Sequence, residues 1–92
     1  MITATSIKQT LKAWPSEWEG IGISGHSFYI RYRHGILTLH SSKIPSTDVW
    51  DAVDGKWIAQ IEVTKENDGI MSTVKMLHHL QPYLKLAKGV SL

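Results

Sequence analysis

The sequence contains no cysteine among its 92 residues. This absence excludes disulfide bridges and any zinc or redox site built from thiolates. No apolar run approaches the roughly 20 residues that a membrane-spanning helix needs. The first residues also lack the basic segment followed by an apolar run that is typical of a signal peptide. Together these absences predict a cytoplasmic protein without a membrane segment.

Neither sign of charge dominates the chain. Ten Lys and Arg residues stand against eight Asp and Glu residues, so the formal net charge is +2 and the isoelectric point is about 9.0. A weakly basic chain is compatible with an anionic partner but does not demand one. The hydrophobic share of 42% is typical of a folded protein, and the length predicts a single small domain over residues 1–92.

The most informative stretch is a hairpin within residues 24–41. Its two halves are rich in aromatic and β-branched residues, and His34-Gly35 separates them. A two-residue loop needs positive φ at both positions, which glycine adopts freely and histidine tolerates better than most residues. This turn pairs Arg33 with Ile36, and strand alternation then separates two faces. One face is apolar, with Phe28, Ile30, Tyr32, Leu37 and Leu39. The other is basic and partly aromatic, with Tyr29, Arg31, Arg33, Ile36, Thr38 and His40.

A second tight turn extends the hairpin into a three-stranded antiparallel meander over about residues 18–41. We place the centre of this turn at Gly25-His26. The resulting register adds isoleucines to the apolar face and puts Trp18 on the basic face, as a cation–π neighbour of an arginine. Its pairs are Ile23 with Phe28, Ile21 with Ile30, and Trp18 with Arg33.

Further segments complete a prediction of an α+β fold. Apolar residues at helical spacing predict an N-terminal helix over about 4–14, which Pro15 ends. They also predict a C-terminal helix over about 70–81, with Ile70, Val74 and Leu77 on its apolar stripe, that either stops near Gln81 or kinks at Pro82 and resumes over residues 83–86. Alternating residues predict a strand near 56–63, with Trp57 on its core side. Residues 48–53 fit either a short strand, which the following Asp-Gly turn slightly favours, or one helical turn. We expect an antiparallel sheet of about four to five strands with the helices at the two ends of the chain.

The histidines form no metal-binding pattern. His26 and His34 stand at opposite ends of one predicted strand, about 26 Å apart. His78 and His79 are neighbours on a predicted helix, so their side chains point about 100° apart and chelate poorly. No nucleophile stands beside an oriented base, and no Gly-rich phosphate loop has the strand–loop–helix context that it needs. We therefore predict no metal, no cofactor and no catalytic residue, and favour a protein that is not an enzyme.

The basic and aromatic face is the candidate binding surface. Arginine and aromatic residues anchor protein interfaces, and they also contact single-stranded nucleic acid. The leading hypothesis is a small binding or regulatory protein that docks a protein partner or a second copy through this face. The alternative is an RNA- or DNA-binding module, and the third hypothesis is a small nuclease-like enzyme with His26 or His40 as base. The predicted partner-binding residues are Trp18, Tyr29, Arg31, Arg33 and His40.

The two faces predict different costs of mutation. Ile30→Ala should destabilise the protein by roughly 2–5 kcal/mol, because it leaves a cavity in the core. Arg31→Ala should change the free energy of unfolding by no more than about 0.5 kcal/mol. Denaturant melts of the two variants measure both effects, and comparable losses would contradict the assignment of faces.

Overall fold

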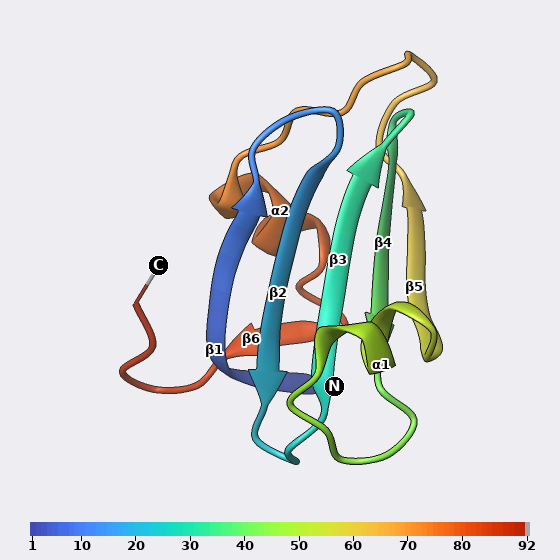
Figure 1. Ribbon diagram of the computed structural model, residues 1–92. Coiled ribbons are helices and arrows are strands. Elements are labelled where there is room, and N and C mark those ends of the chain that lie inside the picture. The colour runs from blue at the N-terminus through green and yellow to red at the C-terminus, as the bar shows by residue number, and fades with distance from the viewer. Residues whose placement is uncertain (92) are drawn as a thin grey trace.

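The computed structural model describes residues 1–91, which form a curled sheet of six strands and two short helices (Figure 1). The strands lie in the order β5-β4-β3-β2-β1-β6, and only β1 and β6 run parallel. The prediction of an α+β fold is correct, but the sheet is mixed and larger than expected. The strands are β1 Ile2–Leu11, β2 Ser16–Gly22, β3 Ser27–Arg33, β4 Ile36–Ser41, β5 Lys56–Glu62 and β6 Leu84–Leu86, and the helices are α1 Val49–Val53 and α2 Thr73–His79.

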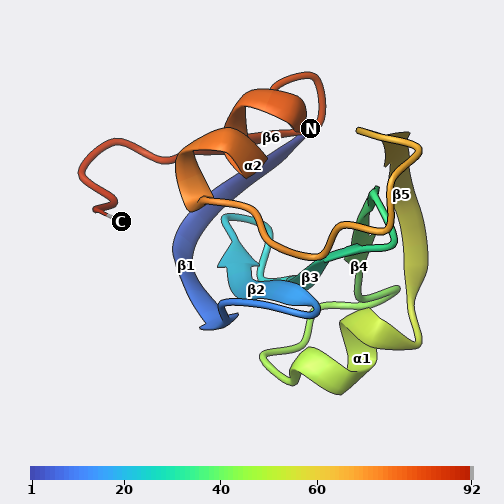
Figure 2. The same cartoon turned by 90° about the horizontal axis from the view of Figure 1, so that it is seen from above.

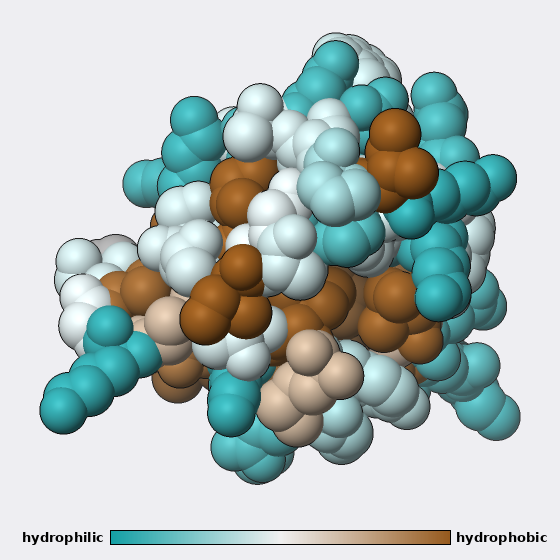
Figure 3. All heavy atoms as spheres, turned by 90° about the horizontal axis from the view of Figure 1, so that it is seen from below, coloured by the Kyte–Doolittle hydropathy of each residue, from teal (hydrophilic) through white to brown (hydrophobic). Residues whose placement is uncertain are grey.

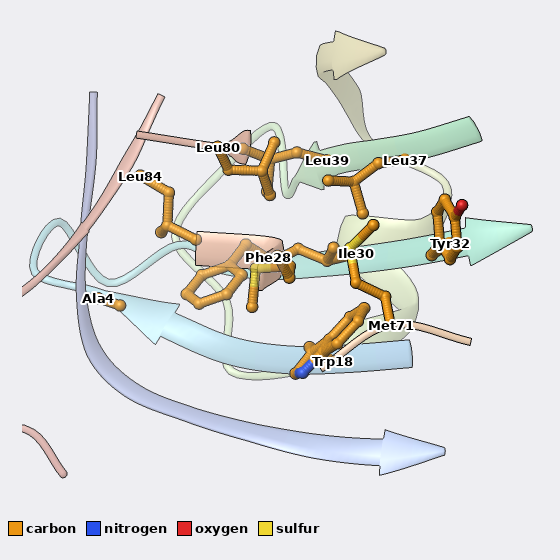
Figure 4. Close-up of a cluster of buried hydrophobic side chains, with 11 residues drawn as sticks. Ala4, Trp18, Phe28, Ile30, Tyr32, Leu37, Leu39, Met71, Leu80 and Leu84 are labelled. Carbon is orange, nitrogen blue, oxygen red and sulfur yellow. The ribbon is translucent and has the colours of Figure 1, made fainter. Parts of the chain in front are cut away.

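The two helices lie on opposite faces of the sheet. Seen from above, the sheet curves around α2, while α1 lies against its convex side (Figure 2). We call the concave side the inner face and the convex side the outer face. The inner face holds the core, in which apolar side chains from the strands meet α2 and the segments beside it (Figure 4). The buried core residues are Ala4, Trp18, Phe28, Ile30, Tyr32, Leu37, Leu39, Met71, Met76, Leu80 and Leu84.

The β3–β4 hairpin has the predicted turn and register. His34 and Gly35 have φ angles of 54° and 75°, so both central residues of the loop lie in the left-handed region. Arg33 pairs with Ile36, and the ladder continues in step to Phe28 and Ser41. The predicted separation of an apolar and a basic face is therefore confirmed for these two strands.

The predicted register of β2 against β3 is wrong. Trp18 pairs with Ile30 instead of Arg33, a slip of three residues, and an odd slip exchanges the two faces of a strand. The reason is the turn, which has three residues and ends on Gly25 at φ 85°, with Gly22 N donating to His26 O at 2.9 Å. Trp18 is therefore buried on the inner face, where its Nε1 donates to Thr73 Oγ1 at 2.9 Å.

The predicted N-terminal helix is also wrong, because residues 2–11 form β1. Pairing with β2 shifts between Ala4 and Ser6 and again between Gln9 and Leu11, and each irregularity changes which side chains face inward. The period-two pattern of a strand is therefore broken. What remains visible is a chance helical spacing of Ile7, Leu11 and Trp14.

The C-terminal helix is shorter than predicted, and α2 begins after Ser72, whose Oγ accepts from Lys75 N at 3.2 Å. Met76 and Leu80 are buried, whereas Val74, expected on the apolar stripe, is 71% exposed. Beyond Pro82 the chain forms β6 along β1 instead of resuming the helix. No helix within residues 1–91 is long and apolar enough to cross a membrane.

Residues 49–53 form a helical turn, α1, instead of the slightly favoured strand. Asp48 caps it, because its Oδ1 accepts from Trp50 N at 3.0 Å. Ser46 Oγ reinforces the start by donating to Asp51 Oδ2 at 2.6 Å. These local hydrogen bonds outweigh the hairpin signal of the following Asp54-Gly55.

Two glycines of β2 give a matched test of the observed register. A Cβ at Gly20 would lie 2.5 Å from Phe28 Cζ and closer still to Ser6 O, whereas at Gly22 the nearest atom would be Ile2 Cγ2 at 3.4 Å. Gly20→Ala should therefore destabilise the protein by roughly 1–3 kcal/mol. Gly22→Ala should cost less than about 0.5 kcal/mol. Thermal or denaturant melts compare the two, and equal effects would refute the packing of Phe28 over Gly20.

Candidate functional site

Four of the five predicted partner-binding residues lie on the outer face. Alternation along β3 and β4 places Tyr29, Arg31, Arg33 and His40 there, opposite to the core residues of the same strands. The fifth, Trp18, lies on the inner face and is fully buried. Trp18 therefore belongs to the core and does not reach the surface on which the other four predicted residues lie.

Helix α1 covers the end of the outer face that holds Tyr29 and His40. The Tyr29 hydroxyl donates to Glu17 on the neighbouring β2, and the side chain also borders a hollow with Trp50 and Val53 of α1. The His40 ring is 6% exposed, and its Nδ1 lies 3.3 Å from Val53 O at the end of α1. His40 is thus engaged with α1, while Tyr29 is held by Glu17 on β2.

His40 is the centre of an aromatic row across three strands. Its ring centroid lies 6.0 Å from that of Tyr29, edge to face, and 4.3 Å from that of Trp57, tilted by 38°. Burial lowers the pKa of His40, and the hydrogen bond to Val53 only partly opposes that effect. A buried, neutral ring packed in this way is poorly suited to act as an exchanging catalytic base.

The other end of the outer face is uncovered. There a shallow hollow of about 160 Å³ lies between β3, the β3–β4 turn, β4 and β5. Trp57, 57% exposed, stands on one side and the two arginines on the other. The lining residues are Arg31, Arg33, His34, Ile36, Thr38, Trp57 and Gln60.

The two arginines have no carboxylate partner among residues 1–91. Within that part of the chain, the only ion pair closer than 4.0 Å joins Lys8 to Glu19 at 3.7 Å. Glu17 stands opposite Arg31 in the β2–β3 ladder, but its side chain accepts a hydrogen bond from Tyr29. Arg31 and Arg33 are therefore available to an acidic group from another molecule.

Trp57 was missed as a surface residue, because its alternation with Ala59 and Ile61 predicts a place in the core. Ala59 and Ile61 do pack against the core. Between Leu39 and His40, however, β5 carries an extra residue, Ile58, so that Trp57 pairs with His40 and turns to the outer face. Nothing in the local sequence marks this bulge.

A close serine–histidine pair lies at the lower end of the molecule. Ser24 Oγ lies 2.8 Å from His26 Nδ1 on the exposed β2–β3 turn. Seen from below, apolar residues gather in the middle of this end and hydrophilic ones surround them (Figure 3). The hollow beside the pair is lined by Ile23, Lys43, Lys56 and other residues, but by no carboxylate that would orient His26.

Residues 1–91 contain no group of three or more His, Asp and Glu side chains that could hold a metal ion.

Comparisons with protein-family models, with curated proteins and with solved structures found no match to this chain. The function of this chain is therefore inferred from the geometry of its outer face.

The burial of His40 predicts a loss of stability in acid. Because its pKa is lower in the folded protein than the ordinary value of 6.5, the unfolded chain takes up the proton first. The free energy of unfolding should therefore be constant above about pH 7 and fall as the pH drops through 6.5 toward the folded pKa. Urea melts at a series of pH values measure this fall.

Two variants assign that pH dependence to one ring. His40→Phe should flatten the stability profile between pH 7 and 5, because the new ring carries no titrating group. His78→Gln, at an exposed position of α2, removes a histidine outside the aromatic row and should keep the fall. A profile that is unchanged in His40→Phe would contradict the assignment.

Proposed function

We propose that this chain is a small non-enzymatic binding protein that docks an acidic protein segment on the uncovered end of its outer face. The observation that carries the proposal is the hollow between Trp57 and the arginine pair, with no carboxylate within 4.0 Å of either guanidinium in the described chain.

The arginine pair is suited to carboxylates. Arg31 and Arg33 are two residues apart on one strand, so their side chains leave the same face about 6–7 Å from each other. A guanidinium binds a carboxylate through two parallel hydrogen bonds, which are stronger than those between neutral groups. An extended segment with acidic residues at alternate positions would meet both arginines with the spacing of a strand.

Trp57 supplies an apolar anchor beside these charges. It is 57% exposed, yet its ring lies 4.3 Å from the His40 ring, which restricts its motion. Tryptophan is among the residues that most often dominate binding energy at interfaces. A side chain that is already held loses little conformational entropy when a partner covers it.

The size of the hollow favours side chains of a macromolecule over a small ligand. Pockets for drug-sized molecules usually enclose about 300–1,000 Å³, whereas this hollow has about 160 Å³. A surface this shallow cannot exclude water from a reacting centre, which speaks against the nuclease-like hypothesis.

Charges around the arginines favour a protein over RNA or DNA as the partner. Glu17 and Glu19 stand on β2 to one side, and Glu62, which pairs with Ile36, stands on β5 to the other. The basic strip is therefore only one strand wide, whereas a phosphate backbone binds best along a continuous basic groove. Tyr29 and His40, which a nucleic acid would need for stacking, are already engaged, Tyr29 with Glu17 of β2 and His40 with Val53 of α1.

A fluorescence titration tests the proposal. The probes are a 12-residue peptide of alternating Glu and Leu, its Gln and Leu counterpart, and single-stranded RNA of mixed sequence. We expect saturable binding of the acidic peptide alone, with loss of more than about tenfold in affinity in Arg31→Ala/Arg33→Ala, because two charge-assisted contacts disappear. Trp57→Phe identifies the part of the signal that comes from the outer face.

A matched variant controls for the loss of net charge. Lys75→Ala/Lys85→Ala removes two exposed positive charges from α2 and β6, outside the hollow, and should bind as the wild type does. Preference for RNA, weakening steeply with salt, would replace the protein partner by a nucleic acid. A folded wild type that binds neither the acidic peptide nor the RNA would overturn the proposal.

A further inference from the structure

Strand β5 forms one edge of the sheet. In the order β5-β4-β3-β2-β1-β6 it has a neighbour on one side only, and Figures 1 and 2 show no other element of residues 1–91 beside its free edge. A seven-residue edge strand presents a row of unpaired backbone groups to which another strand can add. This edge is distinct from the basic hollow, although Gln60 borders both.

The hydrogen-bond pattern shows which backbone groups point outward. The two-residue turn at His34-Gly35 directs the backbone of Ile36, Thr38 and His40 toward β3, so Leu37 and Leu39 bond to β5. Val63 N donates to Gly35 O at 2.9 Å, which agrees with this alternation, because Gly35 lies two residues before Leu37 and Val63 two residues after Ile61. The residues opposite Leu37 and Leu39 are Ile61 and Ala59, and their backbone groups therefore face β4.

It follows that Gln60 and Glu62 direct their N–H and C=O groups away from the sheet, where no strand of residues 1–91 accepts them. Their side chains lie on the outer face and are exposed. On the inner face Ala59 and Ile61 touch the core but are only half-buried. The edge therefore has both open hydrogen-bonding groups and apolar surface that an added strand would cover.

We propose that a second copy of this chain adds its own β5 to this edge, antiparallel, with the twofold axis beside Ile61. In this register Ile61 lies opposite Ile61 of the second copy, and Gln60 lies opposite Glu62. Ala59 lies opposite Val63. The two sheets become one continuous sheet, and the side-chain amide of Gln60 reaches a carboxylate in each half of the interface.

The bulge at Ile58 selects this register over the one that is shifted by one residue toward the N-terminus. Between Ala59 and Val63 the strand is regular, whereas the irregularity lies on the side of Trp57. Moving the axis one residue toward the N-terminus would draw the bulge into the pairing and set Glu62 opposite Ile58, an apolar neighbour. The net charge of +2 per chain is too small to oppose association strongly.

Opposite charges at position 60 give a sharp test. Gln60→Glu sets two pairs of like charges across the interface, while Gln60→Lys sets two attractive pairs at the same exposed position. Sedimentation velocity over a concentration series should show a wild-type dimer. Its dissociation constant should rise roughly three- to tenfold in Gln60→Glu and fall by a similar factor in Gln60→Lys. A wild type that stays monomeric while folded, or equal dimerisation of both variants, would overturn the proposal.

Cross-linking tests the register, because the wild type has no cysteine. Two residues in a non-hydrogen-bonded antiparallel pair have Cα atoms about 4.5 Å apart, within the range of a disulfide. Ile61→Cys should therefore form a covalent dimer under mild oxidation, and Arg33→Cys, exposed on β3, should not. Equal cross-linking at both positions would refute the register.

The dimer and the proposed binding activity can fail separately. Arg31→Ala/Arg33→Ala should lose the acidic peptide but retain the wild-type dissociation constant of the dimer, because neither arginine lies on β5. A monomer that still binds the acidic peptide would overturn only the dimer.

Discussion

The turn at His34-Gly35 is the constraint on which the rest of the sheet depends. Positive φ at both residues closes a two-residue loop, and this loop determines which side chains of β3 and β4 enter the core. The turn also anchors the segment after β5, since Gly35 N donates to Asp68 O at 2.8 Å. A Cβ at Gly35 would lie 2.2 Å from Thr64 O, so this segment approaches as closely as glycine allows.

The segment that the turn anchors also closes the upper end of the core. Tyr32, on the inner face of β3, donates to Asp68 Oδ2 at 2.9 Å. Burial and this hydrogen bond raise the pKa of Tyr32 to about 12, and the same bond lowers the pKa of Asp68. The β3–β4 turn is thus linked to the segment after β5 twice, through the backbone of Gly35 and through the side chain of Tyr32. On the outer face no segment of residues 1–91 covers Arg31 and Arg33, and the hollow between them and Trp57 is open.

Local and non-local features were unequally predictable from the sequence. The β3–β4 register follows from two adjacent residues, so the basic face of these strands could be derived correctly. The two misplaced tryptophans share one kind of cause, an odd shift in strand pairing: the loop ending at Gly25 shifts Trp18 by three residues, and the bulge at Ile58 shifts Trp57 by one. Each odd shift reverses the faces of a strand. Whether a loop has two or three residues depends on packing such as that of Phe28 over Gly20, which no local pattern reveals.

The outer face and the free edge of β5 meet at Gln60, which connects the two proposals physically. Gln60 lines the hollow through its side chain and borders the edge through its backbone. A second copy at the edge would bring Glu62 of that copy beside Gln60, and so set a carboxylate at the rim of a basic hollow. That carboxylate would repel an acidic segment, and linkage requires that the segment in turn weaken the dimer by the same factor. The Glu62 side chain of the second copy would then make self-association and partner binding compete.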